Sequence, residues 1–340
     1  MPGSSASVRS RAALPYGAVM ATGLASELAP VAHARPLWLP LFWMTVVTAV
    51  TIGIRGPIGR QRSRKDPPLT LPLRFGRFTI PIGLEVLARG LGRLGAPAVR
   101  GVAAATTGVA WTLTAVLMVG VARALAPRRG RDRIDGLWFL APAALLADAI
   151  GVARMIGWSP DSTHALLGWL ATASLGLGAI GYAAALVLAA IGFTRSSLAG
   201  HGRSSWWIAA GCGGLGAAAA GRVSAVVPFA ATGVPHDAFE WTALGFWAAG
   251  STVLVPVLAA SLWYLARIRH PKGAPPWTPT FSTGVCALGT GALARLFDIA
   301  VLSTVASAAA IVTLSMWALT VVGRLAAVGT HQQGSQPDVS

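Results

Sequence analysis

The chain has 340 residues, of which 54% are hydrophobic and only 11% are charged, and it contains 40 glycines and 22 prolines. A soluble domain carries roughly twice that share of charge, and soluble helices tolerate glycine and proline poorly, so the composition excludes a soluble fold and favours a membrane protein. The net charge of +16 does not indicate nucleic-acid binding, because the basic residues stand in short connectors between apolar segments.

Ten apolar segments follow one another along the chain, and we predict that each forms a transmembrane helix. The predicted fold class is therefore all-α integral membrane, with a single ten-helix domain over residues 15–325. The segments 1–14 and 326–340 are polar, and we expect both to be cytoplasmic tails, the first without a cleaved signal peptide. The predicted spans are 15–32, 37–54, 79–96, 101–122, 137–156, 165–193, 206–228, 241–266, 279–301 and 304–325.

The third predicted span, residues 79–96, has the weakest apolar pattern. Glu85, Arg89 and Arg93 recur in it at every fourth position, which places all three along one face of a helix. Lipid cannot surround such a face. The segment is therefore either a helix in the interior of a bundle or an amphipathic helix at the membrane surface.

Charge at membrane depth alternates from span to span. The five even-numbered spans carry no ionisable group in their interiors, whereas the odd-numbered spans carry Glu27, Glu85, Asp148, Arg222, Arg295 and Asp298. Because a charge buried in hydrocarbon costs at least ~2 kcal/mol, such residues usually face a bundle interior or a water-filled path. The pattern predicts that odd-numbered helices surround a central pore and that even-numbered helices lie outside, facing lipid.

The connectors predict the orientation of the chain in the membrane. With both termini in the cytoplasm, 20 of the 27 lysines and arginines fall on the cytoplasmic side, in agreement with the positive-inside rule. The links on the other side are mostly short, which indicates five helical hairpins, each pairing a charged helix with an uncharged one. We expect a multi-pass protein of the cell (plasma) membrane.

Glycines recur at short spacing in the seventh and ninth spans. Small residues let helices approach closely in lipid, and they also leave room at an axis. We predict that Gly23, Gly213, Gly216 and Gly284 line the pore or allow close packing. The seventh span holds five glycines, which is more than we expect packing alone to require.

The charges at depth allow two interpretations. In the first, Glu27, Glu85, Asp148 and Asp298 neutralise the arginines in interhelical ion pairs. In the second, one or two arginines stay partly unpaired and attract an anion, for which Arg222 and Arg295 are the candidates, although Asp298 stands three residues after Arg295. The same four carboxylates are also candidates for carrying a proton. The four carboxylates are matched in number by four arginines in the outer halves of the same spans, so the sequence predicts a mixed-charge outer end of a mostly neutral passage; the arginines are Arg89, Arg154, Arg222 and Arg295.

Cysteine and histidine residues indicate no further chemistry. Cys212 and Cys286 both stand in apolar spans, and the six histidines fall in connectors or tails. We therefore expect no disulfide framework, metal site, cofactor or catalytic residue.

Four short motifs resemble the tellurite-resistance/C4-dicarboxylate transporter family, which includes plant slow-type anion channels. The first span, PYGAVMATGLASEL, resembles the family pattern F-x-x-V-M-G-T-G-I-x-S, with Ala21 in place of a glycine. The ninth, PPWTPTFSTGVCALGT, is similar to W-x-x-x-F-P-L-G-M-Y-x-x-A-T, with Ser282 in place of the proline. The segments GLWFLAPAALLADAIGVA and SSWWIAAGCGGLGA resemble two further family helices. The matching residues are Val19, Met20, Thr22, Gly23 and Ser26 in the first span and Trp277, Phe281, Gly284, Ala287 and Thr290 in the ninth.

The resemblance implies ten helices in five hairpins, with the odd-numbered helices lining a pore in each subunit of a homotrimer. It also implies that an aromatic residue of the ninth helix, here Phe281, blocks the pore midway. Without the resemblance, a core or lipid-facing phenylalanine is the simpler interpretation of Phe281. The altered residues that follow it, Ser282, Thr283 and Val285, affect the local helix geometry on which the assignment depends.

The function that these expectations favour is a membrane channel or transporter for small anions. C4-dicarboxylates, tellurite- or sulfite-type oxyanions, halides and nitrate all remain possible substrates. One alternative is a proton-coupled C4-dicarboxylate carrier with the same fold. Another is an integral-membrane enzyme acting on a lipid substrate, which would need a catalytic cluster at one membrane face.

Overall fold

A computed structural model describes residues 14–58, 75–125, 136–193, 203–227, 232–267 and 277–333. These residues form long α-helices joined by short turns, and they contain no strand. The long helices are α2 (Leu14–Leu28), α3 (Trp38–Ile58), α5 (Thr79–Arg93), α6 (Pro97–Leu125), α7 (Leu140–Ile156), α8 (His164–Phe193), α9 (Arg203–Val226), α11 (His236–Arg267), α12 (Trp277–Leu296) and α13 (Ala300–Gln333).

One long helix lies in each of the ten ranges that hydropathy singles out, and most helix ends fall within a few residues of the predicted ones. The largest difference is at the end of α13, which continues to Gln333 through part of the segment expected to be a polar tail. Residues 1–13 and 334–340, and most of the basic residues in the cytoplasmic connectors, lie outside the described residues.

Within the described ranges, six helices are long and apolar enough to cross a membrane. They are α3, α6, α8, α11 and α13, which are mostly exposed, together with α7, which is mostly buried. The remaining four either are short, as are α2 and α5 with 15 residues each, or are rich in glycine and hydroxyl side chains, as are α9 and α12. Long apolar helices around shorter, more polar ones are the pattern of a multi-pass membrane protein.

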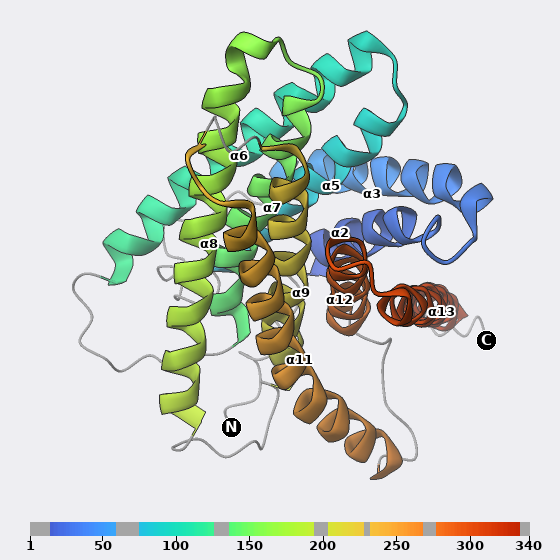
Figure 1. Cartoon of the computed structure of the whole chain (residues 1–340). Coiled ribbons are helices and arrows are strands. Elements are labelled where there is room, and N and C mark those ends of the chain that lie inside the picture. Colours follow the sequence, from blue (N-terminus) through green and yellow to red (C-terminus); the bar gives the residue numbers. More distant parts are fainter. Residues whose placement is uncertain are drawn as a thin grey trace, which may run out of the picture.

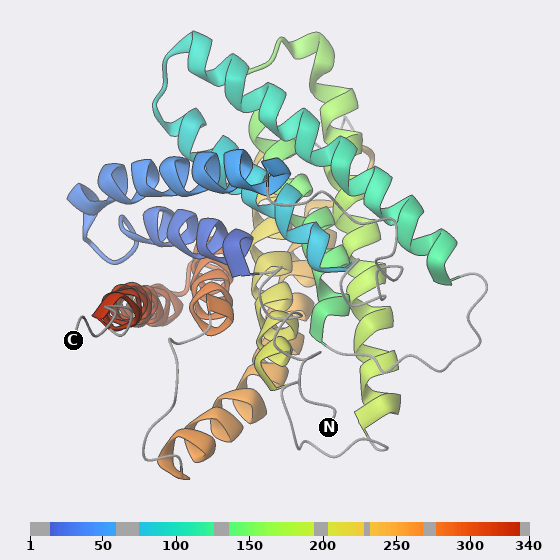
Figure 2. The same ribbon diagram turned by 180° about the vertical axis from the view of Figure 1, so that it is seen from behind.

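The helices pack as five consecutive pairs around an inner ring. Each of α2, α5, α7, α9 and α12 packs against the long helix that follows it in the chain. These five also contact one another in closed cyclic order, α2 to α5, α7, α9, α12 and back to α2. In Figure 1, α8 and α9 run from top to bottom and α11 slants beside them, while α2 and α3 lie across them, so the five pairs are not all parallel. Figure 2 shows α6 and α3 on the outside of the bundle from behind.

The glycines of α9 serve contacts on two sides of that helix. Gly213 faces the backbone of Gly250 on α11, and Gly216 faces the ring of Phe246 on the same helix. Gly211, Gly214 and Gly221 face α12, where a Cβ on Gly214 would lie 2.6 Å from the Cα of Cys286. Packing alone therefore accounts for all five glycines, which corrects the expectation that α9 has more glycine than packing requires.

The other two predicted glycines also lie at helix contacts. Gly23 on α2 faces Val86 of α5 and Thr45 of α3, and Gly284 on α12 faces Leu24 and Leu28 of α2. A methyl group at either position would overlap a neighbouring side chain, so both glycines hold the inner ring closed.

Tryptophans of the outer helices donate hydrogen bonds to the inner ring. The indole Nε1 of Trp247 on α11 lies 3.0 Å from Thr290 Oγ1 of α12, and that of Trp317 on α13 lies 3.1 Å from Thr22 Oγ1 of α2. Because unsatisfied polar atoms are costly in lipid, these bonds favour one register between outer and inner helices.

Candidate functional site

Charged side chains gather where the inner-ring helices end. Each of the five helices carries a charged residue in its last two turns, namely Glu27, Arg93, Arg154, Arg222 and Arg295, and Arg89 lies one turn before Arg93. A helix has partial negative charge at its C-terminal end, so arginines there are favourable. We refer to Arg89, Arg93, Arg154, Arg222 and Arg295 as the arginine cluster.

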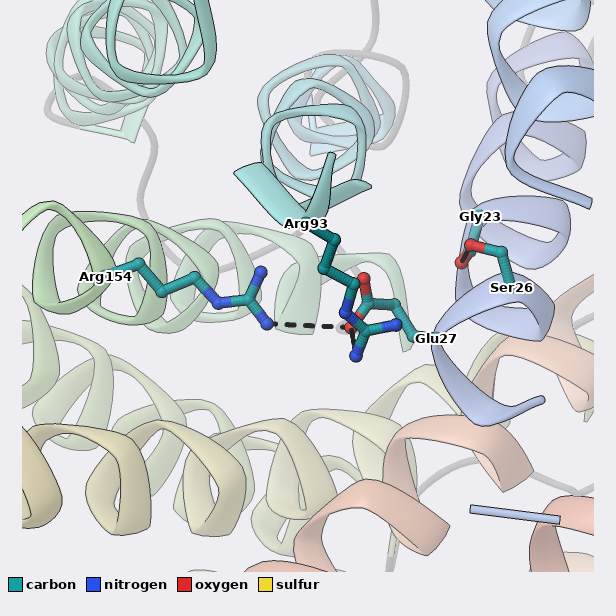
Figure 3. Close-up of polar contacts among 5 residues, drawn as sticks. All are labelled: Gly23, Ser26, Glu27, Arg93 and Arg154. Atoms are coloured by element: carbon teal, nitrogen blue, oxygen red, sulfur yellow. Dashed lines mark hydrogen bonds and ion pairs between the residues drawn. The ribbon is translucent and has the colours of Figure 1, made fainter. Parts of the chain in front are cut away.

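Glu27 forms ion pairs with two of these arginines. The Oε2 atom of Glu27 lies 2.9 Å from Nη2 of Arg93 and 3.6 Å from Nη2 of Arg154, and the residue is only 3% exposed. Figure 3 shows the two guanidinium groups approaching the carboxylate from different helices. The ion pairs therefore connect α2, α5 and α7, while the Oε1 atom of Glu27 has no hydrogen-bond partner within the described ranges.

The remaining arginines extend the cluster around the ring. Arg89 is buried, and it interacts electrostatically with Glu27, Arg93 and Arg154. Arg222, which is half-buried on α9, lies within electrostatic range of Arg154 and of Arg295 on α12. In the part of the chain that the structure describes, no carboxylate forms an ion pair with Arg89, Arg222 or Arg295.

Asp298 does not balance this charge, which corrects the expectation of a buried pair. It is exposed in the turn after α12, with a left-handed φ of 51°, and no ion pair joins it to Arg295 among the described residues. Arg295 is exposed as well. In the described part of the chain, Glu27 is therefore the carboxylate that forms ion pairs with the arginines at this end of the ring.

The two other carboxylates lie away from the ion pairs of Glu27. Glu85 and Asp148 are both 0% exposed. Glu85, on α5, packs against α6 and α7. The hydroxyl of Thr107 on α6 donates to Oε2 of Glu85 at 3.3 Å, and Gly151 of α7 leaves the space that the Glu85 carboxylate fills. The burial of Glu85 and Arg89 favours the interior-helix interpretation of residues 79–93 over a surface amphipathic helix.

Phe281 is buried on α12 with 7% of its surface exposed, and its direction follows from its neighbours. Thr283, two positions on and therefore ~200° around the helix, contacts Thr313 of the outer helix α13 at 3.2 Å. Ser282 lies on the side of α9, and Gly284 lies on the side of α2. The side chain of Phe281 therefore points away from α13, between α2 and α9, toward the interior of the ring.

One polar contact near the cluster was not expected from the sequence. His236, at the start of α11, places Nε2 2.8 Å from Ser224 Oγ of α9 and Nδ1 3.1 Å from Glu240 Oε1. The spacing of His236 and Glu240 by four residues is visible in the sequence, but the contact with Ser224 depends on how α9 and α11 pack. The hydrogen bonds of His236 hold the C-terminal end of α9, which carries Arg222, against α11.

The same turn holds a group of potential metal ligands. Atoms of His236, Asp237 and Glu240 lie within 4.8 Å of one another. However, both ring nitrogens of His236 already contact Ser224 and Glu240, and His236 and Asp237 are exposed. The group is therefore better explained as a link between helices than as a metal centre.

Comparison of the chain with protein-family models and with curated proteins gives no match. The resemblance to the tellurite-resistance/C4-dicarboxylate transporter family therefore rests on the four short motifs of the sequence, and the interpretation of the site rests on its own geometry.

Proposed function

We propose that this protein is a membrane channel or transporter for small anions, and that the arginine cluster is the entrance to its path. The observation that carries the proposal is the convergence of arginines from α5, α7, α9 and α12 at one end of a closed five-helix ring, with Glu27 as their ion-paired carboxylate within the described ranges. An excess of positive charge in a low-dielectric setting attracts anions and repels cations.

Arg222 and Arg295 are the residues best suited to contact an anion. A guanidinium group offers a planar fork of N–H donors that matches the oxygens of a carboxylate, nitrate or sulfite-type oxyanion. Glu27 occupies Arg93 and Arg154, so Arg222 and Arg295 retain donors for a ligand. The residues do not select one substrate, and C4-dicarboxylates, oxyanions and halides all fit this chemistry.

The interior of the ring supplies the path in this proposal, and Phe281 supplies its gate. The direction of Phe281 between α2 and α9 supports that role. A hydrophobic constriction controls conduction by excluding water, so removal of the aromatic ring should open the path.

The proposal also includes the arrangement in the membrane. Ten helices cross the bilayer of the plasma membrane with both termini in the cytoplasm, which places the arginine cluster at the outer surface. Following the resemblance, we propose a homotrimer with one path per subunit, and the exposed apolar faces of the outer helices serve lipid and subunit contacts. Chemical cross-linking in membranes tests the trimer.

Anion efflux from proteoliposomes tests the function. Arg222→Gln should lower nitrate efflux about tenfold, because it removes a charged contact worth about 1.4 kcal/mol. Arg100→Gln is the matched control, since Arg100 is exposed on the outer helix α6 and lies outside the cluster. Phe281→Ala should raise efflux. Equal efflux from Phe281→Ala and protein-free vesicles would contradict the proposal.

One observation favours a second candidate, a membrane hydrolase acting on a lipid ester. Ser224, His236 and Glu240 are hydrogen-bonded in the order of a serine-hydrolase triad. Ser224 is nevertheless buried inside a helix, where backbone N–H groups bond along the helix and do not point at a substrate oxyanion. Labelling of Ser224 by a fluorophosphonate probe would support this candidate, and no labelling would reject it.

A further inference from the structure

We propose that Glu85 and Asp148 form a buried proton-binding site, and that its occupancy is coupled to anion binding at the arginine cluster. The inference rests on the proposed function, because the coupling needs an anion at that cluster. It begins with the carboxylates themselves, which are both 0% exposed and come from neighbouring helices of the inner ring.

The fold brings the two carboxylates to one place. The Glu85 side chain packs against Gly151 so closely that any Cβ there would overlap its carboxylate oxygens. Asp148 precedes Gly151 by three residues, so it lies on the same face of α7, next to the position that Glu85 occupies. The two side chains are close enough to interact electrostatically. Gly151 is therefore the residue that lets α5 and α7 bring the pair together.

The pocket has too few hydrogen-bond donors for two ionised carboxylates. Thr107 donates to Oε2 of Glu85, but Oε1 of Glu85 and both carboxylate oxygens of Asp148 lack a partner in the described structure. Thr114 on α6 lies close enough to act on Asp148, but its hydroxyl donates to the carbonyl oxygen of Ala110 at 3.1 Å, so it does not satisfy the Asp148 carboxylate. A proton on one carboxyl group converts an unsatisfied acceptor into a donor and removes one of two like charges.

No cation in the described structure replaces that proton. No lysine, arginine or histidine forms an ion pair with Glu85 or Asp148 among the described residues. Arg89 and Arg154 act on Glu85 only over a longer range, and α6 contributes hydroxyl groups to the pair and no charge. Two adjacent buried carboxylates with no cation in ion-pair contact are costly to keep ionised together, so in this proposal one of them holds a proton.

The same two arginines connect the pair to the anion entrance. Arg89 lies one turn after Glu85 on α5, and Arg154 belongs to the α7 helix that carries Asp148. Binding of a proton makes this end of the ring more positive, whereas binding of an anion makes it more negative. Each event therefore favours the other, and by linkage the two effects are equal in size.

Nitrate efflux from proteoliposomes between pH 5.5 and 8.0 tests this coupling. Nitrate does not titrate in this range, so a pH effect belongs to the protein. Wild type should conduct about tenfold faster at the acidic end, a typical size for coupling between two sites. The double variant Glu85→Gln/Asp148→Asn replaces both carboxyl groups by neutral amides that do not titrate. It should therefore conduct at every pH as fast as wild type does at the acidic end. If the double variant does not fold, the single variant Asp148→Asn is measured in its place.

Asp161→Asn is the control, because Asp161 is an exposed carboxylate in the turn between α7 and α8, outside both the pocket and the arginine cluster, and it should keep the wild-type pH dependence. A pH dependence that is unchanged in the double variant, or absent from wild type, would overturn the inference while leaving anion transport intact. A dependence on sodium instead of pH, seen by exchange of sodium for choline, would also overturn it. Absence of nitrate efflux from every variant would instead reject the proposed function.

Discussion

At the scale of single residues, Glu27 controls how positive the arginine cluster is. It binds Arg93 and Arg154 through one carboxylate oxygen, and in the described part of the chain it is the carboxylate that forms ion pairs with the cluster. Its removal leaves the guanidinium groups of Arg93, which is exposed, and Arg154, which is half-buried, without their partner, and this changes both charge and stability.

Glu27→Gln should therefore increase the preference for anions over cations, because Arg93 and Arg154 become available to an anion. It should also lower the apparent melting temperature, but because both arginines are partly solvent-exposed the loss of stability should be only about 1 kcal/mol. Reversal potentials and thermal unfolding of the same preparation check both effects. A reduced anion preference in a folded variant would show that Glu27 does not oppose the arginines.

The individual charges were visible in the sequence, but their pairing was not. Charged residues in apolar spans are rare enough that Glu27, Glu85, Asp148 and Arg222 stand out by position alone. Which of them meet depends on the register between helices far apart in the chain. Asp298 illustrates this, because its separation of three residues from Arg295 suggested a helical pair, whereas α12 ends at Leu296 and leaves Asp298 exposed in a turn.

At the scale of helices, close contacts between glycine-rich faces hold the inner ring together. Gly214 of α9 and Gly289 of α12 each face the backbone of the other helix, so α9 and α12 approach more closely than larger side chains would allow.

Gly214→Ala should destabilise the protein by about 1–3 kcal/mol, because the added methyl group overlaps the backbone of α12. Gly108→Ala is the control, since nothing lies within 4 Å of a Cβ at that position on α6. That substitution should be neutral or slightly stabilising in a helix. The melting temperature of Gly214→Ala should be lower than that of Gly108→Ala in the same detergent, and equal melting temperatures would contradict the packing argument.

The link between α9 and α11 gives a second prediction at this scale. His236→Ala should lower stability by about 1 kcal/mol, because Ser224 and Glu240 lose the imidazole that joins them. Asp237→Ala, on the same turn, is the control and should have less effect. A similar loss in both variants would show that the hydrogen bonds of His236 are not what stabilises the turn.

Hydropathy located the helices well and their ends less well. Apolar length identifies a segment that can cross a membrane, but a helix continues wherever residues have helical propensity, as α13 does to Gln333. The glycines of α9 were predicted to matter. Their assignment to two different neighbours, α11 and α12, required the packed structure.

At the scale of the whole molecule, the alternation of charge predicted which helices are inside. The helices α2, α5, α7, α9 and α12 form a closed ring, and the apolar helices α3, α6, α8, α11 and α13 remain exposed. The cyclic order of the ring and the different directions of the pairs in Figure 1 could not be predicted, because they depend on contacts that hydropathy does not encode.

The predicted orientation can be tested with a membrane-impermeant maleimide on intact cells. In a background with Cys212 and Cys286 replaced by alanine, Ser162→Cys between α7 and α8 should react, and Ser197→Cys between α8 and α9 should not. The expectation follows from the basic residues on the cytoplasmic side. Reaction at position 197 with none at 162 would reverse the orientation and place the arginine cluster inside the cell.

The central claim is that the arginine cluster makes this molecule conduct anions, and the most direct test is the reversal potential in a planar bilayer under a potassium nitrate gradient. We predict a potential close to the nitrate equilibrium value for Phe281→Ala, in which the path is open, and a shift toward zero when Arg222→Gln is added. A reversal potential at the potassium equilibrium value, or one that Arg222→Gln leaves unchanged, would contradict the claim.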